Sequence, residues 1–296
     1  MYRFIAVLCL SVLLPVVASA HQPYIVESDE ASVASPEISK VYYGRIEGGE
    51  HVFRVTSEVP FRFYVNLLVP DLPDQTRDFG VVILKADSPI PLGSFESAGH
   101  EWTPFFEPFG YDSYLKGPEF EAPVGAGSYE IRVRSATADA KYALAIGKAE
   151  VFTARDTLHA LLTIPQLKKD FFGGQPVEFM LSPLGAGYVA GMLLFSFLVV
   201  TLVRLLIGLF KGAEGRRKNI GFRGRLVRGV LGVLVIAGTV ATNWNPLLLF
   251  FAGALLYGAL FSWCGLCAVV GITCKPKIPE PDKPTMPPSV AESESA

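Results

Sequence analysis

LGAGYVAGMLLFSFLVVTLVRLLIGLF, residues 184–210, is a long apolar run that holds a single charged residue, Arg204. An α-helix needs roughly 20 such residues to cross the hydrocarbon core of a bilayer, which is about 30 Å thick. A buried helix of a soluble domain is the alternative, but such helices are usually shorter. The run therefore predicts a transmembrane helix over 184–210, and the Arg204 side chain is expected to reach the headgroup region.

The next segment, 211–225, is basic: it holds six Lys or Arg residues and one acidic residue, Glu214. Short loops with such an excess of positive charge stay in the cytoplasm. Two further apolar runs, 226–244 and 246–272, then predict a second and a third transmembrane helix. Trp244 lies between them and is expected at the outer membrane interface, where tryptophan is enriched.

The first 20 residues have the layout of a signal peptide. A positive residue, Arg3, precedes an apolar stretch that ends in Ala18-Ser19-Ala20, and such small residues suit the signal peptidase. We therefore expect cleavage after Ala20, with an uncleaved signal anchor as the alternative. Signal, basic loop and number of spans together predict a multi-pass protein of the bacterial inner membrane, with its N-terminal domain outside and its C-terminus in the cytoplasm.

Between residues 37 and 150 the apolar residues follow a period of two. In FRFYVNLLV, 61–69, Phe61, Phe63 and Val65 share one face while Arg62 lies on the other. This alternation is typical of strands with one buried face and one wet face. Six or more such strands, with no helical period, predict an all-β sandwich that resembles a jelly roll.

Residues 21–36 are expected to form an N-terminal extension before this sandwich. The segment 151–183 predicts an amphipathic juxtamembrane stem on the lipid interface, with a short helix broken near Pro165. The tail, 277–296, is rich in Pro and acidic at its end, so we expect it to be disordered in the cytoplasm. The fold class is thus a multidomain membrane protein: a β-sandwich ectodomain followed by three transmembrane α-helices.

The order of the last strands, GSYEIRV and then AKYALAIG, resembles bacterial pre-peptidase C-terminal-type sandwiches. This resemblance covers about two strands and implies an accessory or binding module more than a catalyst.

An aromatic segment, 99–120, is the first candidate site. Exposed aromatic side chains on a β-sandwich stack on sugar rings or bind a protein partner. The alternative is that the segment folds back and buries its own rings. The candidate residues are Trp102, Phe105, Phe106, Phe109, Tyr111 and Tyr114.

The second candidate site is a copper centre. Cleavage after Ala20 would leave His21 as the first residue, and its α-amino group and imidazole could chelate one copper ion together. His51 or His100 could complete the set. The alternatives are that His51 simply faces solvent and that no cofactor is bound.

The third candidate site is a group of cysteines, Cys264, Cys267 and Cys274, at the inner end of the last span. In the reducing cytoplasm we expect thiols rather than a disulfide. A C-x-x-C pair at a helix end can cycle redox or bind zinc, although no histidine lies nearby to complete a zinc site. Plain packing in the membrane is the alternative, since cysteine behaves as a small apolar residue.

Residues 218–276, from KNIGFRGRLVRGVLGVLVIAG to CGLCAVVGITCKP, resemble the DUF2892 family, the two-helix membrane domain also found at the end of YgaP-type rhodanese proteins. The resemblance implies a helical hairpin that dimerises or anchors other domains. The chain departs from the family pattern at Gly224, where an acidic residue is usual, and at Cys264-Gly265-Leu266-Cys267, where Cys-Pro-Leu-Tyr is usual. Sulfur transfer is not implied, because the sequence holds no rhodanese domain.

The formal net charge of −2 argues against a nucleic-acid partner. The motifs of common enzyme classes, G-x-S-x-G, H-E-x-x-H and the Gly-rich phosphate loop, are absent from the sequence. These observations favour a non-enzymatic membrane anchor whose sandwich binds or scaffolds an envelope protein or a glycan, with a homodimer possible through its helices. Two alternatives stay open: a copper protein that uses His21, and a thiol-based sensor or sulfur-handling partner that uses Cys264 and Cys267.

Overall fold

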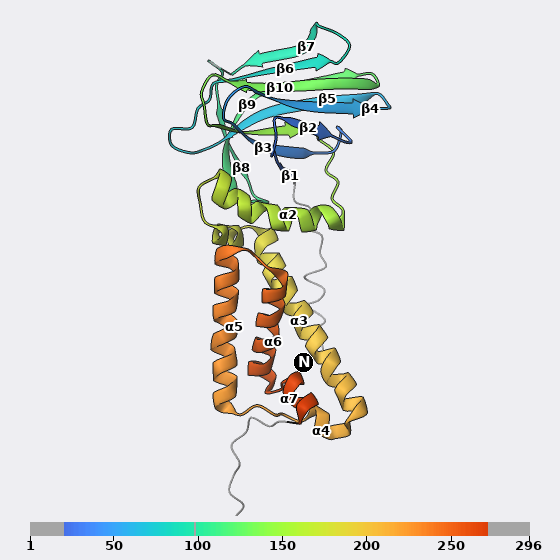
Figure 1. The fold of residues 1–296 in the computed structure, drawn as a ribbon, viewed down its shortest axis with the longest axis vertical. Coiled ribbons are helices and arrows are strands. Elements are labelled where there is room, and N and C mark those ends of the chain that lie inside the picture. The colour runs from blue at the N-terminus through green and yellow to red at the C-terminus, as the bar shows by residue number, and fades with distance from the viewer. Residues whose placement is uncertain (1–20, 98, 272–296) are drawn as a thin grey trace, which may run out of the picture.

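The computed structural model describes residues 21–97 and 99–271. The predicted signal peptide (1–20), the predicted tail (277–296) and Cys274 lie outside the described residues. Three parts follow one another along the long axis of the molecule: a β-sandwich, a short helical stem and a helical bundle (Figure 1).

The N-terminal part is a sandwich of two sheets, which confirms the predicted all-β class. The first sheet has six strands in the order β1 (Gln22–Ile25), β3 (Lys40–Ile46), β11 (Ala140–Ile146), β5 (Phe61–Pro70), β9 (Asp112–Val124) and β8 (Thr103–Glu107). The second has five, in the order β2 (Glu30–Val33), β4 (Glu50–Ser57), β10 (Gly127–Ser135), β6 (Phe79–Lys85) and β7 (Pro91–Glu96).

The two edge strands at the start of the chain, β1 and β2, pair in parallel with β3 and β4, and the other pairs are antiparallel. Both strands come from residues 21–36, which the sequence assigned to an extension before the sandwich. Each has four residues, too few for a period of two to be recognised in the sequence. The sandwich of the structure therefore begins at Gln22 rather than at residue 37.

The core of the sandwich lies between the two sheets, where alternate side chains of each strand meet. On β5 these are Phe63, Val65, Leu67 and Val69, all fully buried. Burial of one face by another sheet is what stabilises an antiparallel sheet.

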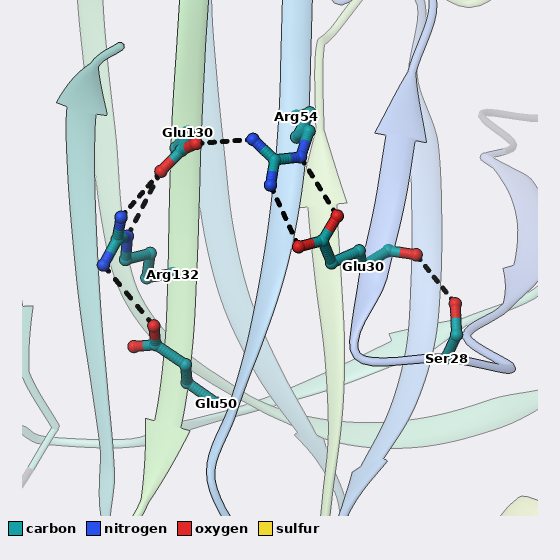
Figure 2. Close-up of polar contacts among 6 residues, drawn as sticks. All are labelled: Ser28, Glu30, Glu50, Arg54, Glu130 and Arg132. Atoms are coloured by element: carbon teal, nitrogen blue, oxygen red, sulfur yellow. Dashed lines mark hydrogen bonds and ion pairs between the residues drawn. The ribbon is translucent and has the colours of Figure 1, made fainter.

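The outer faces of the two sheets differ in chemistry. The five-stranded sheet carries a ladder of ion pairs in which Arg54 joins Glu30 and Glu130, and Arg132 joins Glu130 (Figure 2). Exposed ion pairs add little to stability, but they mark this face as solvated. The outer face of the six-stranded sheet instead carries an apolar cluster, which consists of Val41, Leu68, Tyr114, Ala143 and Ala145.

This apolar cluster changes one expectation. The sequence pattern placed Tyr64 and Asn66 of β5 on a wet face, yet Asn66 is 3% exposed and Tyr64 is 9% exposed. The stem covers part of this face, because Phe172 contacts Tyr114 and Phe171 contacts Tyr43. The face is therefore an interface within the chain.

The stem consists of α2 (Ala154–Gln166), the π-helical turn η1 (Leu167–Phe171) and the 3₁₀ helix η2 (Pro176–Leu181). A capping box starts α2: the Thr153 hydroxyl accepts from the backbone N–H of Asp156, whose carboxylate accepts from the N–H of Thr153. The break expected near Pro165 takes the form of a change in helix type: α2 ends at Gln166, one residue past this proline, and the π-helical turn follows from Leu167.

The C-terminal part is a bundle of α3 (Pro183–Phe210), α4 (Gly212–Arg216), α5 (Phe222–Thr242), α6 (Pro246–Phe261) and α7 (Gly265–Val270). Two of these helices, α3 and α5, are long and apolar enough to cross a membrane. They agree with the runs 184–210 and 226–244 of the sequence within a few residues.

The third predicted span, 246–272, is not one helix. Its first part, α6, has 16 residues, about 24 Å at 1.5 Å per residue, which is short of a bilayer core of about 30 Å. It ends because Ser262 adopts a left-handed conformation, φ 58°, and the next residue, Trp263, turns inward. The indole of Trp263 is buried and donates to the carbonyl of Gly215 at 3.0 Å.

Trp244 joins the bundle to the stem. The sequence suggested a tryptophan at the membrane interface, but this side chain is fully buried. Its indole nitrogen donates to the carbonyl of Pro176 at 3.1 Å, and its ring lies 4.9 Å from that of Phe179. The Tyr188 hydroxyl on α3 donates to the Trp244 carbonyl at 3.2 Å. One residue therefore connects the α5–α6 turn with both η2 and α3.

Candidate functional site

A pocket of about 280 Å³ opens on the outer face of the six-stranded sheet. Its floor includes Ala143 and Ala145 of β11, which point away from the core because Leu144 and Ile146 point into it. Ala143 pairs with Leu68 and Ala145 with Asn66 across to β5. The small alanine side chains leave a hollow beside the larger residues of the neighbouring strands.

Two tyrosines form one wall of this pocket. The hydroxyl groups of Tyr43 on β3 and Tyr114 on β9 lie 2.9 Å apart and share a hydrogen bond. Burial raises the pKa of both phenols well above the ordinary value, so both stay protonated. A pair of neutral hydroxyls can both donate to and accept from a bound polar group.

Asn66 supplies an amide to the same pocket. Its strand, β5, pairs irregularly with β9 just after this residue. The Asn66 amide nitrogen donates to the carbonyls of Gly117 and Pro118 at 3.2 and 3.1 Å. These bonds hold the shifted part of the β5–β9 pairing in place. The amide oxygen accepts no hydrogen bond from the other described residues, so it can serve a ligand.

A buried carboxyl group, Glu107, lies at the end of β8 and lines the pocket. Its two oxygens accept from the backbone N–H groups of Phe109 and Gly110 at 2.8 and 2.6 Å, which holds the turn into β9. Burial outweighs these bonds and raises the pKa of Glu107 to about 7. The group therefore titrates near neutral pH.

A small cavity of about 20 Å³ lies next to the pocket and shares His21 and Glu107 with it. Asp112 lines this cavity and forms a buried ion pair with Lys168 of the stem, Nζ to Oδ1 2.6 Å. Lys168 also donates to the carbonyl of Tyr111 at 2.8 Å. Burial raises the pKa of Asp112 to about 6, although the charge of Lys168 opposes this shift. The pair ties the stem to the sandwich at the edge of the pocket.

The predicted aromatic candidates divide into two groups. Their segment is a hairpin, β8 and β9, rather than a loop. Phe105, Phe106 and Tyr111 are exposed, with Phe106 and Tyr111 in edge-to-face contact. Phe105 also lines the pocket, so the exposed aromatic surface continues into it.

The other three aromatic candidates are packed inside the molecule. Tyr114 is buried, Trp102 packs against the core of the sandwich, and Phe109 contacts Phe152 and the stem–bundle cluster. Trp102 and Phe109 are therefore packed against other parts of the chain, and Tyr114 is buried but also lines the pocket.

The three histidines of the copper hypothesis are held by separate contacts. The Nδ1 atom of His51 lies 2.8 Å from the Tyr142 hydroxyl, and this histidine is buried on β4 rather than facing solvent. His100 contacts the ring of Trp102, and His21 contacts the Ser39 hydroxyl. Burial lowers the pKa of His21. Within 21–97 and 99–271, nowhere do three or more His, Cys, Asp or Glu side chains lie close enough together to hold a metal ion. Copper binding by His21 stays a prediction.

Cys264 and Cys267 lie at the start of α7. The backbone N–H of Cys267 donates to the Cys264 sulfur at 3.5 Å, so this sulfur caps the short helix. Asn219 holds the preceding turn: its amide accepts from the Cys264 N–H at 2.8 Å and donates to the Cys264 carbonyl at 2.9 Å. Both cysteines are partly buried and neither forms a disulfide with another described cysteine. A redox or metal role stays a prediction.

Sequence reasoning missed most of the pocket. Asn66 lies on a strand whose outer face was expected to be wet, Tyr43 was not singled out, and Lys168 was read only as part of an amphipathic stem. One signal was available: AKYALAIG places two alanines, 143 and 145, on the outer face, where an exposed strand usually carries polar residues.

Comparison with known proteins gives two kinds of match. Among curated proteins none matches this chain. Among solved structures, the Yersinia pseudotuberculosis-derived mitogen aligns with 14% identity and a TM-score of 0.26, over 40% of this chain and 92% of the mitogen. The pre-peptidase C-terminal domain of a Bacillus anthracis collagenase aligns with 8% identity and a TM-score of 0.24, over 43% of this chain and 95% of that domain.

The collagenase domain is of the same kind as the pre-peptidase C-terminal-type sandwiches that the strand order of the sequence resembles. The family match concerns the other end of the chain. Residues 216–277 match the family model described as "Inner membrane protein YgaP-like, transmembrane domain", which agrees with the resemblance stated for 218–276. The chain is thus a membrane-associated protein that joins an N-terminal β-sandwich to a C-terminal YgaP-like transmembrane domain.

Proposed function

We propose that this chain is a membrane-anchored, non-enzymatic binding protein of the bacterial cell envelope, and that its sandwich binds a glycan in the pocket of the six-stranded sheet. The observation that carries the proposal is the pocket itself, about 280 Å³ in volume, with an apolar floor, aromatic walls and polar groups around them. A sugar ring has apolar C–H faces and a rim of hydroxyls, so it needs both kinds of contact.

Each side of the pocket has a role in this proposal. The exposed ring of Phe105 offers a surface on which a sugar can stack. The Asn66 amide oxygen and the Tyr43–Tyr114 hydroxyl pair can exchange hydrogen bonds with sugar hydroxyls. Lys116 also lines the pocket, where its ammonium group pairs with Glu119 at 3.0 Å, and it adds a donor for a sugar hydroxyl.

The topology belongs to the same proposal. We place the sandwich outside the cytoplasm, with α3 and α5 as full-length spans, the shorter α6 as the third span, and the basic segment 211–225 in the cytoplasm. The charge of that segment supports this orientation, and so does the predicted signal peptide. Labelling of single introduced cysteines with an impermeant maleimide in whole cells tests it. Reaction at residue 90 and protection at residue 217 are expected, and the reverse pattern would refute the orientation.

A glycan array tests the binding site. The full chain in lipid nanodiscs should bind at least one class of glycan, and Phe105→Ala should weaken the binding roughly fivefold or more, since loss of one stacking contact costs about 1 kcal/mol or more. Ile90→Ala is the matched control, because Ile90 is an exposed apolar residue at the turn between β6 and β7. Equal binding by the three proteins, or binding to no glycan at all, would exclude a glycan site at this pocket.

A further inference from the structure

A groove of about 540 Å³ runs along the outside of the bundle between α5 and α6. All along its length the groove is lined by α5, with Phe222 and Arg225 at one end and Val233 and Leu234 at the other. It is hollow in the middle because Gly229 faces Ala259 there: a Cβ atom on Gly229 would lie 3.7 Å from that of Ala259. The groove belongs to neither the sandwich pocket nor the stem.

The dimensions of the groove fit one leaflet of a bilayer. From Phe222 to Leu234, α5 rises about 18 Å at 1.5 Å per residue. Half of a hydrocarbon core is about 15 Å. Apart from Arg225, the lining is apolar, so the groove offers a continuous surface for one acyl chain that starts at its basic end.

Within the described residues, the basic end of the groove has no acidic partner. Arg225 is exposed, and its Nε donates to the Ala259 carbonyl at 2.7 Å, near the end of α6. Its other two guanidinium nitrogens make no hydrogen bond within the described residues. The sequence from 215 to 279 holds no Asp or Glu at all, and among the ion pairs of 21–97 and 99–271 none involves Arg225. The Nε contact fixes the guanidinium at the mouth of the groove and leaves it free for an anion.

We propose that this groove is a binding site for an anionic phospholipid. The lipid phosphate pairs with the outer edge of the Arg225 guanidinium, and one acyl chain lies against Leu226, Gly229 and Val233. Basic pockets between membrane helices are known to take acidic headgroups, and a planar guanidinium suits a phosphate better than a point charge does. The site needs α5 to lie in a membrane, but it is independent of what the sandwich binds.

Native mass spectrometry of the full chain tests the proposal. Protein released from nanodiscs of mixed phosphatidylglycerol and phosphatidylcholine should retain phosphatidylglycerol preferentially. Arg225→Gln should lower the retained fraction about fivefold, which is the effect of one basic residue near an acidic headgroup. Arg223→Gln is the matched control, since it removes the same charge from the same helix outside the groove, and it should change retention less than twofold.

A second variant separates the charge from the helix-end contact. Arg225→Lys gives up the Nε contact with Ala259 but keeps a positive charge, and it should retain most of the bound phosphatidylglycerol. Three results would overturn the proposal: equal retention of the two lipids, equal losses in the Arg225→Gln and Arg223→Gln variants, or a dimer whose partner copy cross-links at Val230 and excludes lipid from the groove.

Discussion

Replacing Lys168 by Met should destabilise the chain by about 3–5 kcal/mol, the usual cost of removing one partner of a buried ion pair. Lys168 is 2% exposed and Asp112 is 8% exposed at the side chain, so water cannot replace the lost ammonium group. The variant would leave the Asp112 carboxylate and the Tyr111 carbonyl without their donor. The stem would then lose its polar contact with the turn between β8 and β9.

Thermal unfolding of the full chain in nanodiscs measures this loss. For a unit of this size 1 kcal/mol corresponds to about 2–4 °C, so the sandwich and stem should melt roughly 6–20 °C lower in the variant. Lys169→Met is the matched control: Lys169 is adjacent and exposed, and its replacement should change the melting temperature by no more than 1–2 °C, about 0.5 kcal/mol for a surface change.

The pH dependence adds a sharper test of the same reasoning. Burial already raises the pKa of Asp112 to about 6, and without Lys168 this pKa rises further. At pH 5 the carboxyl of the variant is neutral, so the loss of stability relative to the native chain should be smaller there than at pH 8. The double variant Lys168→Met with Asp112→Asn should recover part of the loss, because no charge stays buried. A loss independent of pH, and additive in the double variant, would refute the reasoning.

Three further predictions concern single groups. The pKa of Glu107 in the folded chain, about 7, lies above its ordinary value. Its contribution to stability, on the order of 3 kcal/mol, is therefore present below about pH 4.5 and lost as the pH rises through 7. Glu107→Gln should flatten the rise in melting temperature between pH 8 and pH 5, and an unchanged slope would contradict this. Asn219→Ala leaves the backbone of Cys264 without two hydrogen bonds and should cost about 2–3 kcal/mol, seen as a lower melting temperature. Lys218→Ala, at the adjacent exposed residue, is the control. Trp244→Phe removes the bond to Pro176 and should cost about 1–3 kcal/mol, with faster proteolysis of the stem; equal proteolysis rates would argue against this contact.

The sequence was sufficient to predict the sandwich class and the two long helices. Alternation along β5 placed Phe63 and Val65 in the core, where the structure has them, because a buried sheet face needs apolar residues at every second position. The pattern could not tell that the opposite face is covered as well. That depends on contact with Phe171 and Phe172, which lie about a hundred residues further along the chain.

The helix ends and the site were harder to predict for related reasons. The apolar run of the sequence continues past residue 261, yet α6 ends there. The causes are the left-handed conformation of Ser262 and the buried indole of Trp263, which donates to Gly215. An average of hydropathy along the segment records neither of them. The aromatic candidates were chosen by residue type alone. Which rings are exposed was decided by the hairpin, whose turn depends on the backbone bonds of Glu107.

The fixed attachment between sandwich and bundle limits where the sandwich can reach. If residues 151–183 were a flexible tether, their ends would lie about 30 Å apart on average and the domain would sweep a wide volume above the bilayer. Instead, Lys168 fastens them on one side and Trp244 on the other. The sandwich is therefore held at one height and one tilt relative to the helical bundle, and any force applied to the sandwich is passed directly to the helices.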